Sequence, residues 1–143
     1  MNKLKSKPPL SFWIISILAL IWNIKVVFSY LGIAFMKDQK FNLLPAPEKE
    51  YLSTIPVLIS ATYTISVLAG IIGCMFLLLR RKKAALIFLV AFIADIIYQH
   101  YFLVIQKNIE IVSNNSTYPI VSVIVSFLLV VFASSNHKED YFN

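Results

Sequence analysis

Asp95 is the residue in this chain that is best placed to do chemistry. It lies about 11 residues into an apolar stretch that begins at Ala84, roughly 17 Å along a helix that rises 1.5 Å per residue. An aspartate near the centre of a bilayer costs about 2.5–3.5 kcal/mol on insertion scales, so we expect its side chain to face the interior of a helix bundle. There it finds a polar partner or carries a proton. A carboxyl group in such a place can bind a proton or a polar solute.

Polar side chains at a similar depth could complete this site. Gln99 lies one helical turn after Asp95 on the same face. In the first apolar stretch the candidates are Asn23 and Lys25, but these positions lie about 160° apart around a helix, so only one can point at a given neighbour. We expect an intramembrane polar layer of Asp95 and Gln99 with either Asn23 or Lys25. The second and fourth apolar stretches offer further polar residues, namely Thr62, Tyr63, Ser66 and Ser122.

Two interpretations of this polar layer stay open. In the first, it binds a proton or a solute, because an ionisable residue inside the membrane usually marks a functional site. In the second, it is a buried contact that fixes the register of the helices or joins the chain to another subunit. Lys25 has a further alternative, since near the outer surface its long side chain can extend toward the lipid headgroups.

The sequence contains little else that could catalyse a reaction. His100 lies about 140° around the helix from Asp95, so the two cannot form an acid–base pair on one face. Cys74 is the one cysteine, which excludes a disulfide within the chain and a cysteine-based metal site. The motifs of metal-binding helices, serine nucleophiles and phosphate-binding loops are absent. We therefore predict a protein that is not an enzyme and that has no catalytic residue, cofactor or metal site.

The composition places these residues in a membrane. Hydrophobic residues make up 59% of the 143 residues and charged residues only 14%, whereas soluble domains carry about 25% charged residues. The net charge of +6 comes mainly from basic residues that flank the apolar stretches, which suits lipid headgroups rather than nucleic acid. We expect an integral, multi-pass membrane protein whose partner is the lipid bilayer and not a nucleic acid.

Four apolar stretches are long enough to cross a bilayer, which takes about 20 residues per helix. They cover residues 10–35, 55–79, 84–105 and 119–133, and we expect the first to remain as an uncleaved span. The predicted fold is therefore all-α. Residues 1–143 form a single domain, an antiparallel bundle of four transmembrane helices.

Local signals mark some of the predicted helix ends. Pro56 and Pro119 each follow residues that can cap a helix, which is the pattern of an N-terminal cap with a first-turn proline. The capping residues are Ser53-Thr54 and Ser116-Thr117. Between the first two spans, residues 45–52 could form a short amphipathic helix on the membrane surface.

The distribution of lysine and arginine predicts the orientation. Eight basic residues lie in the two tails and the turn at residues 80–83, and four lie in the loops on the other side. Since basic residues accumulate in cytoplasmic segments, we expect both termini and this turn in the cytoplasm. The turn consists of Arg80, Arg81, Lys82 and Lys83, which can also contact anionic lipid headgroups.

Small residues recur four apart in the second span, as Ser66 with Gly70 and as Ala69 with Gly73. Such residues let two helices approach closely. This small-residue face can pack against the chain's own helices, or it can bind a second copy of the chain or another membrane subunit.

Several short motifs are spread over most of the chain. They are Pro9-Leu10-Ser11-Phe12-Trp13-Ile14, Leu20-Ile21-Trp22-Asn23, Tyr30, Gly73-Cys74 and Leu77-Leu78-Leu79-Arg80-Arg81-Lys82. Together they resemble a group of small four-span bacterial inner-membrane proteins, whose members are often labelled sugar transporters. The resemblance implies a bacterial cytoplasmic membrane, and it assigns no substrate-binding residues.

These features predict a small non-enzymatic inner-membrane protein that serves as an accessory or assembly subunit of a larger membrane complex. This prediction rests on the small size, the lack of a soluble domain and the small-residue face. The alternative is an oligomeric transporter of a small solute, coupled to protons through Asp95. The expected protein partners are other membrane subunits in the first case and further copies of the chain in the second.

Overall fold

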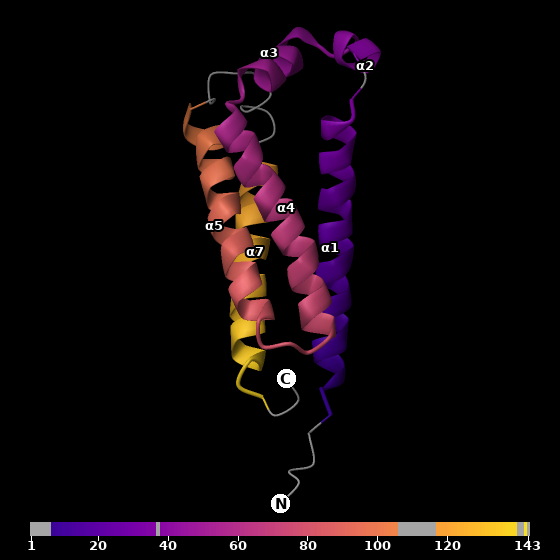
Figure 1. Cartoon of the computed structure of the whole chain (residues 1–143), viewed down its shortest axis with the longest axis vertical. Helices are drawn as coiled ribbons and strands as arrows, with labels where there is room; N and C mark the ends of the chain where they lie inside the picture. The colour runs from indigo at the N-terminus through magenta and orange to yellow at the C-terminus, as the bar shows by residue number, and fades with distance from the viewer. Residues whose placement is uncertain (1–6, 37, 106–116, 140–141, 143) are drawn as a thin grey trace, which may run out of the picture.

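The chain folds into helices. The structure, a computed structural model, describes residues 7–36, 38–105, 117–139 and 142, and no strand occurs among them. Its four long helices are α1 (Leu10–Ala34), α4 (Val57–Leu78), α5 (Ala84–His100) and α7 (Thr117–Asn136), as Figure 1 shows. A π-helical turn, η1 (Tyr101–Ile105), continues α5, and two short helices, α2 (Asp38–Asn42) and α3 (Ala46–Thr54), join α1 to α4.

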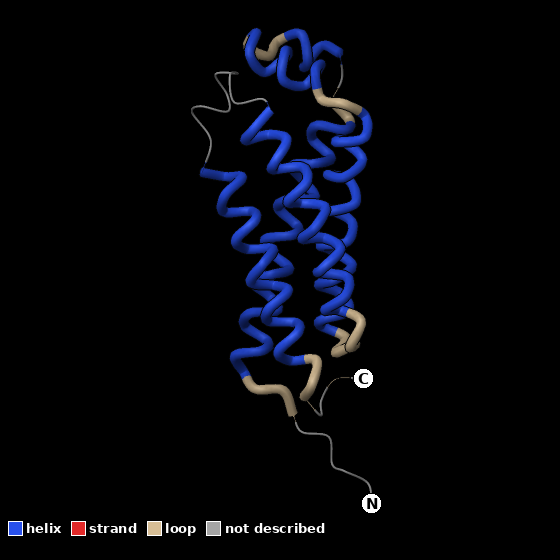
Figure 2. The backbone as a smooth tube through the Cα atoms, turned by 90° about the vertical axis from the view of Figure 1, so that its left-hand side faces the viewer, coloured by secondary structure: helices blue, strands red, loops and turns tan. Residues whose placement is uncertain are grey.

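The four long helices form an antiparallel bundle. α5 packs against α4 and α7, and α1 packs against α4. Aromatic contacts between α1 and α7 close the bundle, since Trp22 stacks on Tyr118 and Phe12 on Phe132 with ring centroids 6.4 and 5.9 Å apart. The short helices α2 and α3 lie across one end (Figure 2). The predicted all-α bundle of four antiparallel transmembrane helices is thereby confirmed.

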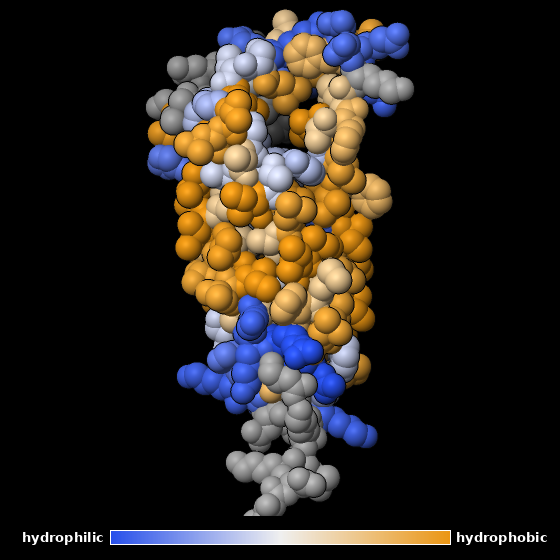
Figure 3. Space-filling view, viewed as in Figure 1, coloured by the Kyte–Doolittle hydropathy of each residue, from blue (hydrophilic) through white to orange (hydrophobic). Residues whose placement is uncertain are grey.

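The long helices suit a membrane in both length and surface. α1, α4 and α7 have 25, 22 and 20 residues, and the segment Ala84–Val104, which is α5 with most of η1, supplies another 21. About 20 helical residues cross the hydrocarbon core of a bilayer. Figure 3 shows an apolar band around the middle of the molecule, bounded by hydrophilic residues at both ends. Large apolar side chains face outward from every long helix, among them Leu18, Leu68, Ile93 and Leu128. The chain is an integral, multi-pass membrane protein.

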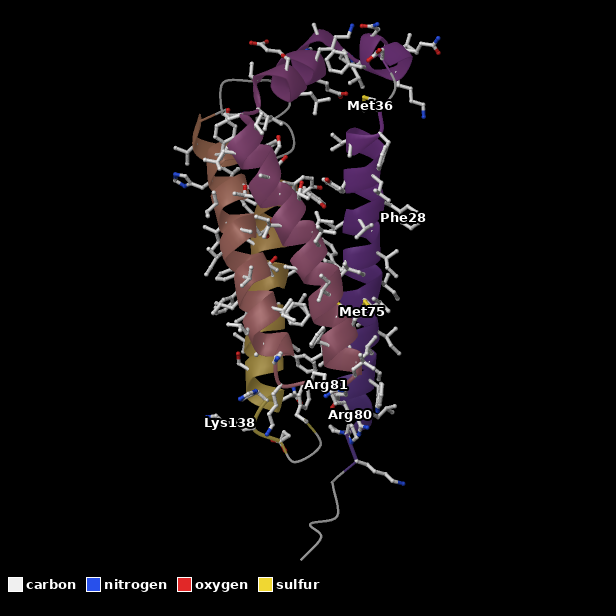
Figure 4. All side chains as sticks on the ribbon, in the orientation of Figure 1. Phe28, Met36, Met75, Arg80, Arg81 and Lys138 are labelled. Carbon is white, nitrogen blue, oxygen red and sulfur yellow. The ribbon has the colours of Figure 1, made fainter. Side chains whose placement is uncertain are left out.

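The turn between α4 and α5 is built around Arg80. Its φ of 55° lies in the left-handed region, and two hydrogen bonds close the end of α4 there. Arg81 N–H donates to the oxygen of Phe76 at 2.8 Å and Arg80 N–H to that of Leu77 at 2.9 Å, which is the Schellman arrangement. Figure 4 shows Arg80 and Arg81 at the same end of the bundle as Lys138, where α1 begins and α7 ends. We refer to this end of the bundle as the basic end.

The predicted caps and the predicted short helix have different outcomes in the structure. Ser53 and Thr54 lie in the last turn of α3, where their hydroxyl groups donate to the backbone oxygen of Glu50 at 3.0 and 2.9 Å. The prediction that they cap the second span is wrong, because α3 runs on to Thr54 and α4 starts after Pro56. The short helix expected at residues 45–52 is present as α3. The other predicted cap depends on Ser116, which lies outside the described residues, as do residues 106–115.

An apolar core fills the bundle near the basic end. Leu77 and Ala84 flank the basic turn in sequence, while Phe12 lies at the start of α1 and Ala133 near the end of α7. All four side chains are buried. Packed apolar side chains therefore fill the interior of the bundle at this end. The complete buried cluster is Phe12, Ala19, Cys74, Leu77, Ala84, Phe88, Leu129, Ala133 and Phe142.

Candidate functional site

The carboxyl group of Asp95 lies inside the bundle and is held by three side chains. Only 3% of the residue is exposed. Gln99 donates from Nε2 to Oδ1 at 3.1 Å. From α7, Ser122 donates to Oδ2 at 3.0 Å, and Ser126 donates to the same oxygen at 2.9 Å. All three donors are neutral, so they satisfy the carboxyl oxygens without supplying a positive charge.

Helical spacing explains why these four side chains meet. Asp95 and Gln99 are four residues apart on α5, and Ser122 and Ser126 are four apart on α7, so each pair occupies one face of its helix. The two faces meet at the contact between α5 and α7. Gln99 and Ser122 are among the residues singled out from the sequence, whereas Ser126 is not. Its spacing from Ser122 is the signal by which it could have been found.

A carboxyl group with these partners can hold or release a proton. The hydroxyl groups of Ser122 and Ser126 can donate to an ionised carboxylate, or rotate and accept from a protonated one. Among the described side chains that line the site, Asp95 is the only charged one, so its ionised form has no counter-ion there. The site therefore holds no ion pair among its described side chains, and a cation that entered it would meet no positive charge there.

Asn23 reaches the same interior from α1. The residue is 8% exposed, and its Nδ2 donates to the backbone oxygen of Ala19 at 2.9 Å and to Cys74 Sγ at 3.3 Å. Its amide oxygen lies so close to Gly70 that a Cβ atom there would be 2.2 Å away. No hydrogen bond joins Asn23 to Asp95 among the described residues, but both side chains line one cavity. α1 and α4 together thus fix the position of this amide.

Lys25 does not join the polar layer. It is exposed on the outside of α1, with its ammonium group 5.6 Å from the centroid of the Trp22 ring. Helix phase is the reason, because Asn23 points inward and position 25 therefore points away. Of the two alternatives left open by the sequence, Asn23 is the one that lines the cavity. His100 is also exposed, at the end of α5.

The cavity between Asn23 and Asp95, called the central cavity below, is small. Its volume is about 30 Å³, which is enough for a buried water molecule. Each of the four long helices contributes to its wall, with Trp22 and Asn23 from α1, Tyr63 and Gly70 from α4, Asp95 and Gln99 from α5, and Tyr118 and Ser122 from α7. A water molecule or small chemical group in this cavity would therefore contact all four long helices.

Two larger cavities adjoin the central cavity on the side of α2 and α3. The one of about 360 Å³, called the outer cavity below, shares Tyr63, Gln99 and Tyr118 with the central cavity. The other, of about 220 Å³, lies between α1, α3 and α4 and also includes Tyr63. Figure 3 shows a hollow in the surface between α1 and α4, just below α2 and α3. Tyr63 lines all three cavities and so marks their junction.

Tyrosine rings form much of the wall at this junction. Tyr63 stacks on Tyr98 with ring centroids 4.5 Å apart, and Tyr30 meets Tyr63 edge-on at 5.7 Å. Such rings present an apolar face and a hydroxyl group to anything that enters.

Toward the basic end the central cavity is sealed. Phe88 and Leu129 belong both to its wall and to the apolar core described above. The outer cavity therefore adjoins the central cavity on the side of α2 and α3, and a further cavity of about 370 Å³ between α1 and α7 adjoins it laterally at Trp22 and Leu129.

The small-residue face of α4 is used within the chain. Gly70 and Gly73 are buried; Gly70 faces Asn23 of α1, and a Cβ atom on Gly73 would lie 2.9 Å from the ring of Phe88 on α5. Ser66 lines the central cavity, and Ala69 is half-buried. These close approaches fix the distances of α1 and α5 from α4.

Comparison of the chain with known protein families, with curated proteins and with solved structures finds no match. In the part of the chain that the structure describes, no group of three His, Cys, Asp or Glu side chains is placed to hold a metal ion. Fold and site together define a small four-helix, multi-pass membrane protein with a buried carboxyl group on a central cavity.

Proposed function

We propose that the protein binds a small solute at Asp95 and carries it across the membrane, with proton binding at the same carboxyl group. The observation behind this proposal is the position of Asp95, whose neutral partners and adjacent cavity all belong to one chain. A residue that only held helices together would need no cavity beside it. An apolar residue would also avoid an insertion cost of about 2.5–3.5 kcal/mol.

The arrangement of cavities suits one state of an alternating-access cycle. The central cavity beside Asp95 adjoins the outer cavity at Tyr63, Gln99 and Tyr118, while Phe88 and Leu129 lie on its side toward the basic end. Transport requires a second state in which this seal parts and the outer side closes. Four helices supply few walls for a pathway, so we propose that the working unit is a homo-oligomer, most simply a dimer.

The proposed orientation places the basic end in the cytoplasm of a bacterial inner membrane. Arg80, Arg81, Lys82 and Lys83 lie at that end, and basic residues accumulate on the cytoplasmic side. The hollow near α2 and α3 then faces outward, and a solute enters from outside. The resemblance of the sequence motifs suggests a sugar-transporter label, but it assigns no residue of this site.

An accessory subunit of a larger membrane complex, without enzymatic activity, is the second candidate. Lys25 favours it, because a cation on the outer face of a membrane helix either extends to the headgroups or is covered by a partner. The small-residue face favours it less, since Gly70 and Gly73 are engaged within the chain. Purification in mild detergent tests this candidate. A co-purifying membrane protein would support it, and migration as the 16.3 kDa chain or its own dimer alone would contradict it.

Proton movement in liposomes tests the transport proposal. The purified protein is reconstituted with an internal pH-sensitive dye, and hexoses, amino acids and amines are added outside one at a time. We expect proton movement that depends on one solute class, that Asp95→Asn abolishes and that Lys25→Gln leaves intact. Proton movement that Asp95→Asn leaves unchanged, or none with any solute, would contradict the proposal.

A further inference from the structure

The described side chains on the walls of the three cavities include one charged group. Among the described side chains that line them, Asp95 is the only acidic residue, and no lysine, arginine or histidine is present. Lys25, the one basic residue of α1, is exposed on the outside of the bundle. An ionised Asp95 would therefore attract a cation into these cavities and repel an anion.

Aromatic rings make up much of the remaining wall. Tyr63 and Tyr118 line both the central and the outer cavity, and Tyr98 and Phe102 line the outer one. Aromatic faces attract cations that lie within about 6 Å of the ring centroid, and more strongly where water is excluded. Acidic and aromatic groups together form a wall that suits an organic cation.

The cavity volumes place a solute in the outer cavity. The central cavity of about 30 Å³ admits a group of the size of water, whereas small-molecule sites occupy about 300–1,000 Å³, a range that includes the outer cavity of about 360 Å³. Gln99 lies on the boundary between them and bonds Asp95 at 3.1 Å. A solute in the outer cavity can therefore place its charged group beside Gln99, one hydrogen bond away from Asp95, without entering the central cavity.

We infer that the solute is an organic monocation, an amine or a quaternary ammonium compound. Its charged group lies in the outer cavity at Gln99, the residue that bonds Asp95, and its apolar part packs on Tyr63, Tyr98 and Phe102. The inference rests on the proposed solute site and adds its substrate class. An organic anion would face Asp95 without a basic partner among the described wall residues. A sugar would find ring faces and polar side chains in the outer cavity, but as an uncharged molecule it would gain no charge attraction to an ionised Asp95.

Three compounds of nearly one shape separate charge from size. They are choline, its neutral isostere 3,3-dimethylbutan-1-ol and the anion 3,3-dimethylbutanoate, and glucose is added as an uncharged polyol. Binding to the full chain in nanodiscs is followed by the fluorescence of Trp22, which lines the central cavity. Trp13→Phe removes the other tryptophan, which lies exposed on α1. We expect saturable binding of choline and at least tenfold weaker binding of the other three compounds.

Matched variants separate the role of charge from that of structure. Asp95→Asn is expected to weaken choline binding at least tenfold while the affinity for the neutral isostere stays unchanged, and Asp95→Glu is expected to retain choline binding in part. Tyr63→Leu removes the ring face and is expected to bind choline at least threefold more weakly than the parent chain, whereas Tyr63→Phe keeps the ring face and is expected to retain more of the affinity than Tyr63→Leu. The compound series and the two conservative variants keep the inference testable even where Asp95→Asn does not fold.

Equal affinity for choline and its neutral isostere would overturn the inference, as would choline binding that Asp95→Asn leaves unchanged. Asp95-dependent binding of glucose in place of choline would overturn the cationic substrate class and leave the proposed solute site intact. Failure of every compound to bind, together with no solute-dependent proton movement in liposomes, would overturn both.

Discussion

Ser126 on α7 donates a hydrogen bond of 2.9 Å to Oδ2 of Asp95 on α5. This bond crosses from one transmembrane helix to the next beside the central cavity. Ser122 donates to the same oxygen at 3.0 Å, and Gln99 donates to the other carboxyl oxygen at 3.1 Å. The contact that joins α7 to α5 thus also orients the carboxyl group, so structure and proposed function depend on the same atoms.

Ser126→Ala is expected to destabilise the bundle by about 1 kcal/mol, because it removes a donor to a buried carboxyl group. Ser135→Ala is the matched control on the same helix. Ser135 is exposed and bonds only the backbone oxygen of Val131, at 2.8 Å, so its loss should cost about 0.5 kcal/mol or less. Unfolding in mixed micelles by increasing dodecyl sulfate measures both changes. Equal stability of the two variants would contradict a structural role for the Ser126 bond.

Gly70→Ala is expected to destabilise the contact between α1 and α4 by about 1–3 kcal/mol, because the new methyl group would lie 2.2 Å from the amide oxygen of Asn23. The same unfolding assay measures the effect. Gly32→Ala is the control, since nothing lies within 4 Å of a Cβ atom there, and alanine should stabilise α1 by up to about 1 kcal/mol.

A double variant tests the cause of this effect. If the clash with the amide is responsible, Asn23→Ala should remove most of the cost of Gly70→Ala, so that the two changes are strongly non-additive. Additive losses in the double variant would show that Gly70 has another role.

Arg80→Gly is expected to stabilise the turn between α4 and α5 by about 0.5–1 kcal/mol. Arg80 holds a φ of 55°, a conformation that costs a residue with a Cβ atom roughly 1–2 kcal/mol and that glycine adopts freely. Arg81→Gly removes the same charge without relieving any such strain, so it should bring no gain. Thermal unfolding of the two variants in detergent compares them. A gain for Arg81→Gly as large as that for Arg80→Gly would point to charge repulsion among the basic residues instead.

The bundle could be predicted from sequence because each span is a stretch of about 20 apolar residues, and the short turn at residues 80–83 forces α4 and α5 to be antiparallel. The pair Asp95 and Gln99 could also be predicted, since a spacing of four on one helix places two side chains together whatever surrounds them. Ser126 could not be tied to Asp95 in this way. Their contact depends on the rotation and height of α7 against α5, which no spacing within one helix contains.

The choice between Asn23 and Lys25 shows the same limit. Helix geometry states that only one of them faces the interior, and the rotation of α1 decides which. That rotation is set by close packing against α4, where Gly70 leaves room for the amide of Asn23. The outer cavity could not be predicted either, because Tyr63, Gln99 and Tyr118 come together only when three helices pack.

The predicted topology can be measured with cysteine labelling in whole cells. In a Cys74→Ser background, Asp38→Cys on α2 should react with a membrane-impermeant maleimide added outside. Lys138→Cys at the basic end should react only after the cells are lysed, because basic residues accumulate on the cytoplasmic side. Both positions are exposed, so access to the reagent depends on the side of the membrane alone. Labelling of Lys138→Cys in intact cells would reverse the proposed orientation and the side from which a solute enters.

Asn23→Ala and Lys25→Gln are expected to differ sharply in solute binding, although the two residues are neighbours in sequence. Asn23 lines the central cavity opposite Asp95, and its loss removes a polar wall group and the bond to Cys74. We expect it to weaken choline binding by about tenfold, equivalent to about 1.4 kcal/mol. Lys25 is exposed on the outer face of α1, so Lys25→Gln should leave the affinity within about twofold of the parent chain. Titration of Trp22 fluorescence compares the two variants. Loss of binding in Lys25→Gln with normal binding in Asn23→Ala would mean that the lysine serves the site, which requires a different rotation of α1.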